Sequence, residues 1–168
     1  MEQLKVIKPR NYLYEFLVLL SQLIIITIWW LLLQNLLEAL MTGCISYLIL
    51  AWTLRLTFQK HHRKAMKLMH IKNYSDAISA FQNSYDFFEK HPNIDKYRFI
   101  TMFSSSAIPY QQMALNNIGI CYLYMNENTK ALDSFQKLAA LNENYPYITK
   151  TIEEIQKHMD ETIDEQNA

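Results

Sequence analysis

Few residues in this 168-residue chain have the types and spacing that chemistry requires. His61 and His62 stand side by side, but adjacent residues on a helix point about 100° apart, and no cysteine or carboxylate stands nearby at ligand spacing. Cys121 falls on an apolar helix face, where a buried thiol is inert packing. We therefore expect no catalytic residue, no bound metal and no cofactor.

The motifs that bind phosphate or shape a nucleophile are also missing. The chain has no glycine-rich phosphate loop and no nucleophile elbow. Its only glycines are Gly43 and Gly119, and so few glycines disfavour a turn-rich β fold and favour an all-α fold. Cys44 and Cys121 fall in different predicted layers, so we expect no disulfide. These observations predict that the protein is not an enzyme.

A long apolar stretch covers residues 16–54, in which Glu38 is the only charged residue and Gln34-Asn35 is a polar break. Residues 16–33 alone span about 27 Å as a helix, near the thickness of a bilayer. This run is longer than a signal-peptide core, and no small-x-small cleavage site follows it. We predict a hairpin of two transmembrane helices, within 12–58, at about 12–33 and 37–58.

The alternative for this stretch is a pair of buried core helices in a soluble bundle. We favour the membrane hairpin, because a soluble helix normally shows one polar face and these show none. Ala39 and Gly43 stand four residues apart, a spacing that permits close helix contact. Arg55 is expected to extend its charge to the membrane–water interface.

The charges are segregated along the chain although the net charge is zero. Residues 1–72 contain nine basic and three acidic residues, and residues 73–168 contain seven and thirteen. This split indicates a basic part near a membrane and an acidic part away from it, and it disfavours a nucleic-acid partner.

Basic residues flank both predicted spans on one side, in the leader at 1–11 and after residue 54. This pattern places both termini on the cytoplasmic side, in the bacterial cytoplasmic membrane. The basic residues after the second span either stop its transfer or bind anionic lipid at the membrane surface. The candidates for that surface are Lys60, Arg63, Lys64 and Lys67.

Apolar residues recur at helical spacing through the rest of the chain, residues 59–168. Ala77, Ile78 and Phe81 lie on one helix after a break at residues 73–75, where Ser75 is the expected cap. Pro109 is suited to begin a later helix. The pattern predicts two helix–turn–helix units, at about 59–92 and 109–145.

The second unit resembles a tetratricopeptide repeat (TPR), with Ala114–Leu141 reading ALNNIGICYLYMNENTKALDSFQKLAAL. The positions that carry the resemblance are Leu115, Ile118, Gly119, Tyr122, Ala131 and Phe135, and Ala77 and Phe81 match it in the first unit. Asn126 replaces the family's turn glycine, and asparagine tolerates the left-handed conformation. Small residues at 119 and 131 would let the two helices approach.

The two units are 54 residues apart, against 34 in the family, which indicates an insertion at 93–108. Asn93 is expected to cap a short helix there. We expect the aromatic residues of the insertion to pack under the repeats as an extra layer, with a binding lip as the alternative.

The last predicted helix, 146–165, has an apolar stripe with acidic residues away from it. The stripe consists of Ile148, Ile152, Ile155, Met159 and Ile163. Helical repeats need a terminal helix with a polar outer face, so we interpret this helix as a cap. A coiled-coil dimerisation helix is the alternative, but the stripe is short for one.

The resemblance implies a scaffold that binds a protein or peptide partner on the cytoplasmic face of the membrane. The candidate partner-binding face consists of Met113, Asn116, Asn117, Ile120 and Tyr124. Two repeats and a cap are few for a stable core, which favours an assembly partner, a homo-oligomer among the options. The alternative function is a small accessory subunit of a larger transport or secretion complex, in which the hairpin makes the contacts.

Overall fold

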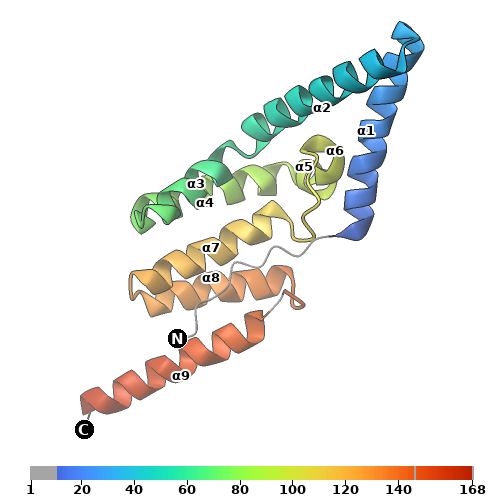
Figure 1. Cartoon of the computed structure of the whole chain (residues 1–168). Helices are drawn as coiled ribbons and strands as arrows, with labels where there is room; N and C mark the ends of the chain where they lie inside the picture. The colour runs from blue at the N-terminus through green and yellow to red at the C-terminus, as the bar shows by residue number, and fades with distance from the viewer. Residues whose placement is uncertain (1–10, 146, 168) are drawn as a thin grey trace. The chain divides into compact units, whose positions relative to one another are not determined.

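The computed structural model is all-helical. It describes residues 11–145 and 147–167, with side chains through residue 161, and nine helices follow one another within these ranges. The described residues form two compact units (Figure 1). We call residues 11–60 and 91–109 the hairpin unit, and residues 61–90, 110–145 and 147–167 the repeat unit. The predicted leader at 1–11 lies outside the described residues except for Asn11.

The two predicted apolar helices are confirmed as α1 (Tyr12–Leu33) and α2 (Leu36–Phe58). Both are long and apolar enough to cross a membrane. The side chain of Asn11 accepts the N–H of Leu13 at 3.0 Å and begins α1, and Asn35 begins α2 in the same way. Gln34 closes α1 in the left-handed conformation, with φ of 54°, so the chain reverses within two residues.

The closest approach of α1 and α2 depends on the small residues of α2. A Cβ at Gly43 would lie 2.8 Å from Ile26 Cγ1 and 3.0 Å from Ile26 Cα, so only glycine fits. Ala39 is fully buried at the same seam. Trp29 donates its indole N–H to Ser46 Oγ at 3.0 Å and links the helices further. The predicted small-residue contact is therefore confirmed.

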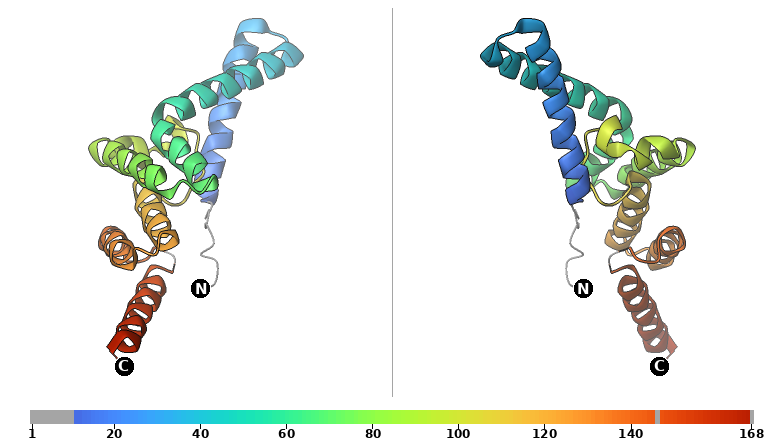
Figure 2. Two further views of the ribbon diagram at one scale, coloured as in Figure 1. Left: turned by 90° about the vertical axis from the view of Figure 1, so that its left-hand side faces the viewer. Right: turned by 90° about the vertical axis from the view of Figure 1, so that its right-hand side faces the viewer.

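The insertion packs on the hairpin. It contains the short helices α5 (Pro92–Lys96) and α6 (Arg98–Thr101), which lie between the diverging α1 and α2 (Figures 1 and 2). The rings of Phe99 and Tyr14 lie 5.2 Å apart, and those of Phe103 and Tyr47 lie 5.0 Å apart. The predicted layer beneath the repeats is therefore wrong. His91 precedes the first helical residue, where Asn93 was expected.

A buried arginine holds the insertion together. Arg98 is 4% exposed and donates to the carbonyls of Asp95 at 2.8 Å, Ser106 at 2.8 Å and Ala107 at 2.9 Å. The Asp95 carboxylate lies 4.0 Å from its guanidinium and offsets the charge. The guanidinium also lies over the ring of Tyr14, 5.0 Å from its centre. One side chain thus joins α5, α6, the following loop and α1.

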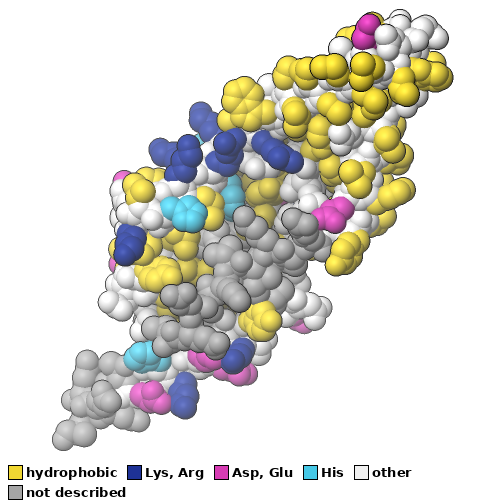
Figure 3. All heavy atoms as spheres, viewed as in Figure 1, with side chains coloured by type: hydrophobic (Ala, Val, Ile, Leu, Met, Phe, Trp, Pro, Cys, Tyr) yellow, Lys and Arg dark blue, Asp and Glu magenta, His cyan; other side chains and the backbone are white. Residues whose placement is uncertain are grey.

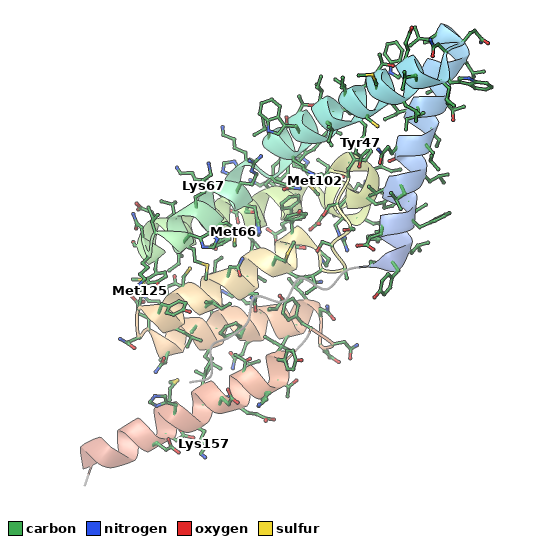
Figure 4. The ribbon with its side chains drawn as sticks, in the orientation of Figure 1. Tyr47, Met66, Lys67, Met102, Met125 and Lys157 are labelled. Carbon is green, nitrogen blue, oxygen red and sulfur yellow. The ribbon has the colours of Figure 1, made fainter. Side chains whose placement is uncertain are left out.

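A second arginine binds the same segment from α2. Arg55 donates to the carbonyls of Met102 at 3.0 Å and Phe103 at 2.7 Å. Figure 4 shows Tyr47 on α2 and Met102 in the insertion, and Met102 is fully buried. Arg55 lies in the last turn of α2, and its placement at a membrane–water interface stays a prediction.

The repeat unit consists of five helices. They are α3 (Lys60–His70, of which Lys60 belongs to the hairpin unit), α4 (Tyr74–Lys90), α7 (Tyr110–Tyr124), α8 (Asn128–Leu141) and α9 (Ile148–Asn167). In chain order α4 packs on α7, α7 on α8, and α8 on α9. The core around α3, α4 and α7 consists of Ala65, Ala77, Ala80, Phe81, Ala114, Ile118 and Cys121.

Two turns in this unit have the same backbone geometry, 54 residues apart. Asn73 donates its N–H to the Leu68 carbonyl at 3.0 Å, and Glu127 donates to the Tyr122 carbonyl at 3.0 Å. The residues just before them, Lys72 and Asn126, have φ of 62° and 58°. These are the hydrogen bonds of a helix that ends in a left-handed residue. The α3–α4 and α7–α8 connections therefore share one turn geometry.

The start of α4 differs from the prediction. Asn73, and not Ser75, caps the helix, because its side-chain oxygen accepts the N–H of Asp76 at 3.3 Å. The Asn73 amide also donates to the Asp76 carboxylate at 2.8 Å. Ser75 lies inside the helix.

The predicted C-terminal helix is present as α9, and its buried face is slightly rotated from the predicted stripe. Ile148, Thr151 and Ile155 are buried, whereas Ile152 and Met159 are half-buried. Thr151 was not predicted to lie on this face. The side chain of Ile163 lies outside the described residues.

We predict that Arg98→Met destabilises the insertion while keeping most of the apolar stem. Three carbonyls would lose their donor, at about 1–3 kcal/mol for each group that stays buried and unsatisfied. Chymotrypsin cleavage of the full chain in detergent micelles, followed at Tyr97, Phe99 and Phe103, should therefore accelerate at least tenfold. Arg63→Met on half-buried α3 is the matched control, and equal cleavage of both variants would show that Arg98 does not hold the insertion.

Candidate functional site

The predicted partner-binding face lies on α7, and the structure divides its residues. Met113 and Asn116 are half-buried, and Tyr124 is 56% exposed at the end of the helix. Asn117 and Ile120 are only 4% and 5% exposed. Since α7 is covered on several sides, most of its surface is core.

Asn117 and Ile120 therefore do not present themselves to a partner, and the prediction is corrected for these two residues. The Asn117 amide points toward α3 and lies 3.6 Å from Met66 Sδ as a weak hydrogen bond. Figure 4 shows Met66 on α3, toward α7. The sequence pattern failed here because it assumed that one face of α7 is free, whereas α3 and α4 both contribute to its environment.

An aromatic pair, in which Tyr124 is exposed and Tyr74 is half-buried, lies at the edge of this face. Tyr124 stacks on Tyr74 with ring centres 5.0 Å apart and planes inclined by 10°. Tyr74 is the first residue of α4 and Tyr124 the last of α7, so the pair joins these two helices. Stacked tyrosines are large and lose little conformational entropy on binding, which suits them to contact a partner. No spacing in the sequence pairs these two residues.

The residues predicted to pack the repeats lie beneath this surface. They are all buried except Tyr122, which is half-buried: Leu115, Ile118, Gly119, Ala131, Phe135, Ala77 and Phe81. Gly119 faces the Phe135 ring, and a Cβ there would lie 2.6 Å from Phe135 Cζ. Phe135 is 1% exposed, so its ring has little room to move. The absence of a side chain at Gly119 is thus what lets α7 and α8 pack as they do.

Basic side chains gather over α3 (Figure 3). Lys60, Lys64 and Lys67 are exposed and Arg63 is half-buried, while α3 itself contains no acidic residue. The face toward α4 and α7 carries Ala65 and Met66. This arrangement makes α3 amphipathic, with an apolar face in the core and a cationic face that fits phosphate or carboxylate groups.

His62, one of the two adjacent histidines, belongs to the core. Its ring meets those of Phe81 and Tyr110 edge-on, at 5.5 Å and 5.1 Å between centres. Nδ1 lies 3.5 Å from Ser84 Oγ. Burial lowers the pKa of His62 to about 4, so the ring is neutral at pH 7. Its neighbours are aromatic rings and a hydroxyl, which suit packing rather than metal ligation.

The described side chains offer little for catalysis. Cys121 is fully buried, and burial raises the pKa of its thiol to about 12, so it stays protonated. No group of three histidine, cysteine or carboxylate side chains gathers in the described part of the chain. The surface instead offers an aromatic pair and a cationic helix face, which suit recognition.

Comparison with known proteins gave no further guide. No protein-family model, curated protein or solved structure matched the chain.

We predict that Gly119→Ala destabilises the repeat unit. An alanine gains about 1 kcal/mol of helix propensity over glycine, whereas overpacking against a fixed ring costs about 1–3 kcal/mol, so the net effect is a loss. Thermal unfolding of the full chain in micelles, followed by circular dichroism, measures it. Phe135→Leu should recover part of the loss in the double variant, and simple additivity of the two changes would contradict the contact.

We predict a stability loss in acid that depends on His62. The folded pKa near 4 lies below the unfolded value of 6.5, so the unfolded state takes up the proton first as pH falls. The contribution of neutral His62 to the free energy of unfolding is fully present above pH 6.5. It decreases by about 3 kcal/mol as the pH falls toward 4. His62→Phe should remove that part of the pH dependence, and exposed His70→Gln should not. Identical pH profiles for wild type and His62→Phe would contradict the assignment.

Proposed function

We propose that this protein is a membrane-anchored scaffold whose TPR-like repeats hold a protein or peptide partner on the cytoplasmic face. The observation that carries the proposal is the matching geometry of the turns at Lys72 and Asn126, in a chain that also contains an exposed apolar hairpin. Stacked helix pairs form extended binding surfaces, and this is their commonest use.

The exposure of α1 supports the membrane anchor. No described residue of α1 is buried, although its sequence is almost entirely apolar. Its 22 residues measure about 33 Å, which matches the hydrocarbon thickness of a bilayer. An apolar surface of this size is not stable in water and needs lipid or protein around it.

The polar groups within the hairpin support a tether rather than a conduit. Thr27 donates to the Leu23 carbonyl at 2.9 Å, and Trp29 donates to Ser46. Glu38, the one acidic residue of α2, lies in its first turn, where the Asn35 amide donates to it at 3.0 Å. A charged group in the first turn of a spanning helix lies near the bilayer surface and leaves the centre without one.

The binding surface that remains after the burial of Asn117 and Ile120 centres on the aromatic pair. Tyr124 and Tyr74 would supply the apolar contact, and Asn116 an amide donor and acceptor for a peptide backbone. The cationic face of α3 would attract either an acidic segment of the partner or anionic lipid. The proposal requires no catalytic group.

We predict that a photo-crosslinking residue at Tyr124 of the full-length protein captures a defined partner in membranes. The same residue at Gln136, exposed on α8, is the matched control and should not capture it. Gly119→Leu, which separates α7 from α8, should abolish the Tyr124 adduct. A partner captured only from Leu48 on α2 would favour the accessory-subunit alternative, an adduct of doubled mass would indicate a homo-oligomer, and no adduct at Tyr124 would contradict the scaffold.

A further inference from the structure

The two long helices contact each other from the tip of the hairpin to its middle. These contacts include Ile26 with Gly43, Trp29 with Ser46, and Gln22 with Cys44. Toward the open end α1 and α2 diverge, and the insertion lies between them (Figure 2). The insertion is therefore part of the hairpin's own packing.

The contacts of the insertion show how far it extends along the hairpin from the open end. Ser105 accepts the N–H of Asn11, the residue just before α1, at 3.0 Å, and so lies at the open end. Phe103 reaches Tyr47, which stands 11 residues, or about 16 Å of helix, before the last residue of α2. If the hairpin spans a bilayer with Phe58 at its surface, the insertion extends from the headgroups at Ser105 toward the middle of the hydrocarbon core at Phe103.

Irregular backbone at that depth requires hydrogen-bond partners within the protein. Arg55 and Arg98 serve the carbonyls of residues 102, 103, 106 and 107. The Ser104 N–H donates to the Arg98 carbonyl at 3.0 Å, and the Ser106 hydroxyl donates to the Ile108 carbonyl at 2.8 Å. These bonds satisfy several of the segment's polar groups within the protein, which favours a low-dielectric environment.

The outward side of the insertion carries the residues that favour a membrane interface. Ile100 is 57% exposed and Tyr97 is 46% exposed, on or next to α6. The Lys96 ammonium lies over the Tyr97 ring, 5.4 Å from its centre, so a cation and an aromatic ring stand together. Near the same end of the hairpin, α1 also carries exposed apolar side chains, Leu13 and Phe16.

We propose that residues 96–103 form an interfacial wedge that enters the cytoplasmic leaflet, with Ile100 among the upper acyl chains and Tyr97 and Lys96 at anionic phospholipid headgroups. Aromatic rings and lysines favour the headgroup level, and an isoleucine favours the acyl boundary. The inference rests on the proposed membrane anchor, because the wedge reaches lipid only if the hairpin does.

The test places a fluorophore on Ile100→Cys in the full-length protein. A Cys44→Ala background leaves Cys121, which is fully buried, as the remaining native thiol. The protein is reconstituted in vesicles of phosphatidylcholine and phosphatidylglycerol. Quenching is measured with lipids that carry a nitroxide at the fifth or the twelfth acyl carbon, and with aqueous iodide.

Three further labelling positions serve for comparison. Leu48→Cys on α2 reports the anchor, Gln136→Cys on α8 reports a water-exposed site, and Tyr97→Cys is a second position on the wedge.

We expect fluorophores at Ile100 and Tyr97 to be quenched at least twofold more by the shallow nitroxide than by the deep one, and to resist iodide. The Leu48 fluorophore should be quenched more by the deep nitroxide. If iodide quenches Ile100 and Tyr97 as it does Gln136 while Leu48 is quenched by lipid, the wedge is wrong and the anchor stands. If lipid does not quench Leu48 either, the anchor itself is wrong.

Discussion

The packing of the hairpin unit depends on hydrogen-bond donors for the backbone carbonyls of the insertion, which lies between two apolar helices. Neither α1 nor α2 has a free backbone N–H in its middle, and their side chains are mostly apolar. Arg55 and Arg98 supply the donors, and between them they bind the carbonyls of Asp95, Met102, Phe103, Ser106 and Ala107. The planar guanidinium is suited to this role because it offers five donors and no acceptor. Without these bonds the insertion would have unsatisfied polar groups where it lies.

The repeat unit depends on a different constraint, the distance between paired helices. At Gly119 the absence of a Cβ lets the Phe135 ring reach the backbone of α7, and the fully buried Ala65 stands at the corresponding position of α3, 54 residues earlier. Both pairs then reverse through a left-handed residue, Lys72 in one and Asn126 in the other. The two connections therefore share their backbone hydrogen bonds as well as their apolar spacing.

Local features of this fold and the helix contact at Gly43 could be predicted from the sequence, whereas most other tertiary contacts could not. The bounds of α1 and α2 follow from hydropathy, and the left-handed Asn126 follows from its side chain. The role of Arg98 could not be predicted, because its partners are backbone carbonyls, which carry no sequence identity. Asn117 was placed on a free face because the periodicity of α7 does not show that α3 covers it.

The order of synthesis gives the hairpin unit an unusual assembly problem. Arg55 is separated from its acceptors at Met102 and Phe103 by 47 and 48 residues, and all of α3 and α4 is made in between. At ribosomal rates of about 5–20 residues per second, the open end of the hairpin waits roughly 2–10 seconds for the segment that fills it. During that interval the guanidinium of Arg55 must be solvated by water or lipid phosphate. The hairpin therefore reaches its final packing only after the first repeat has been synthesised.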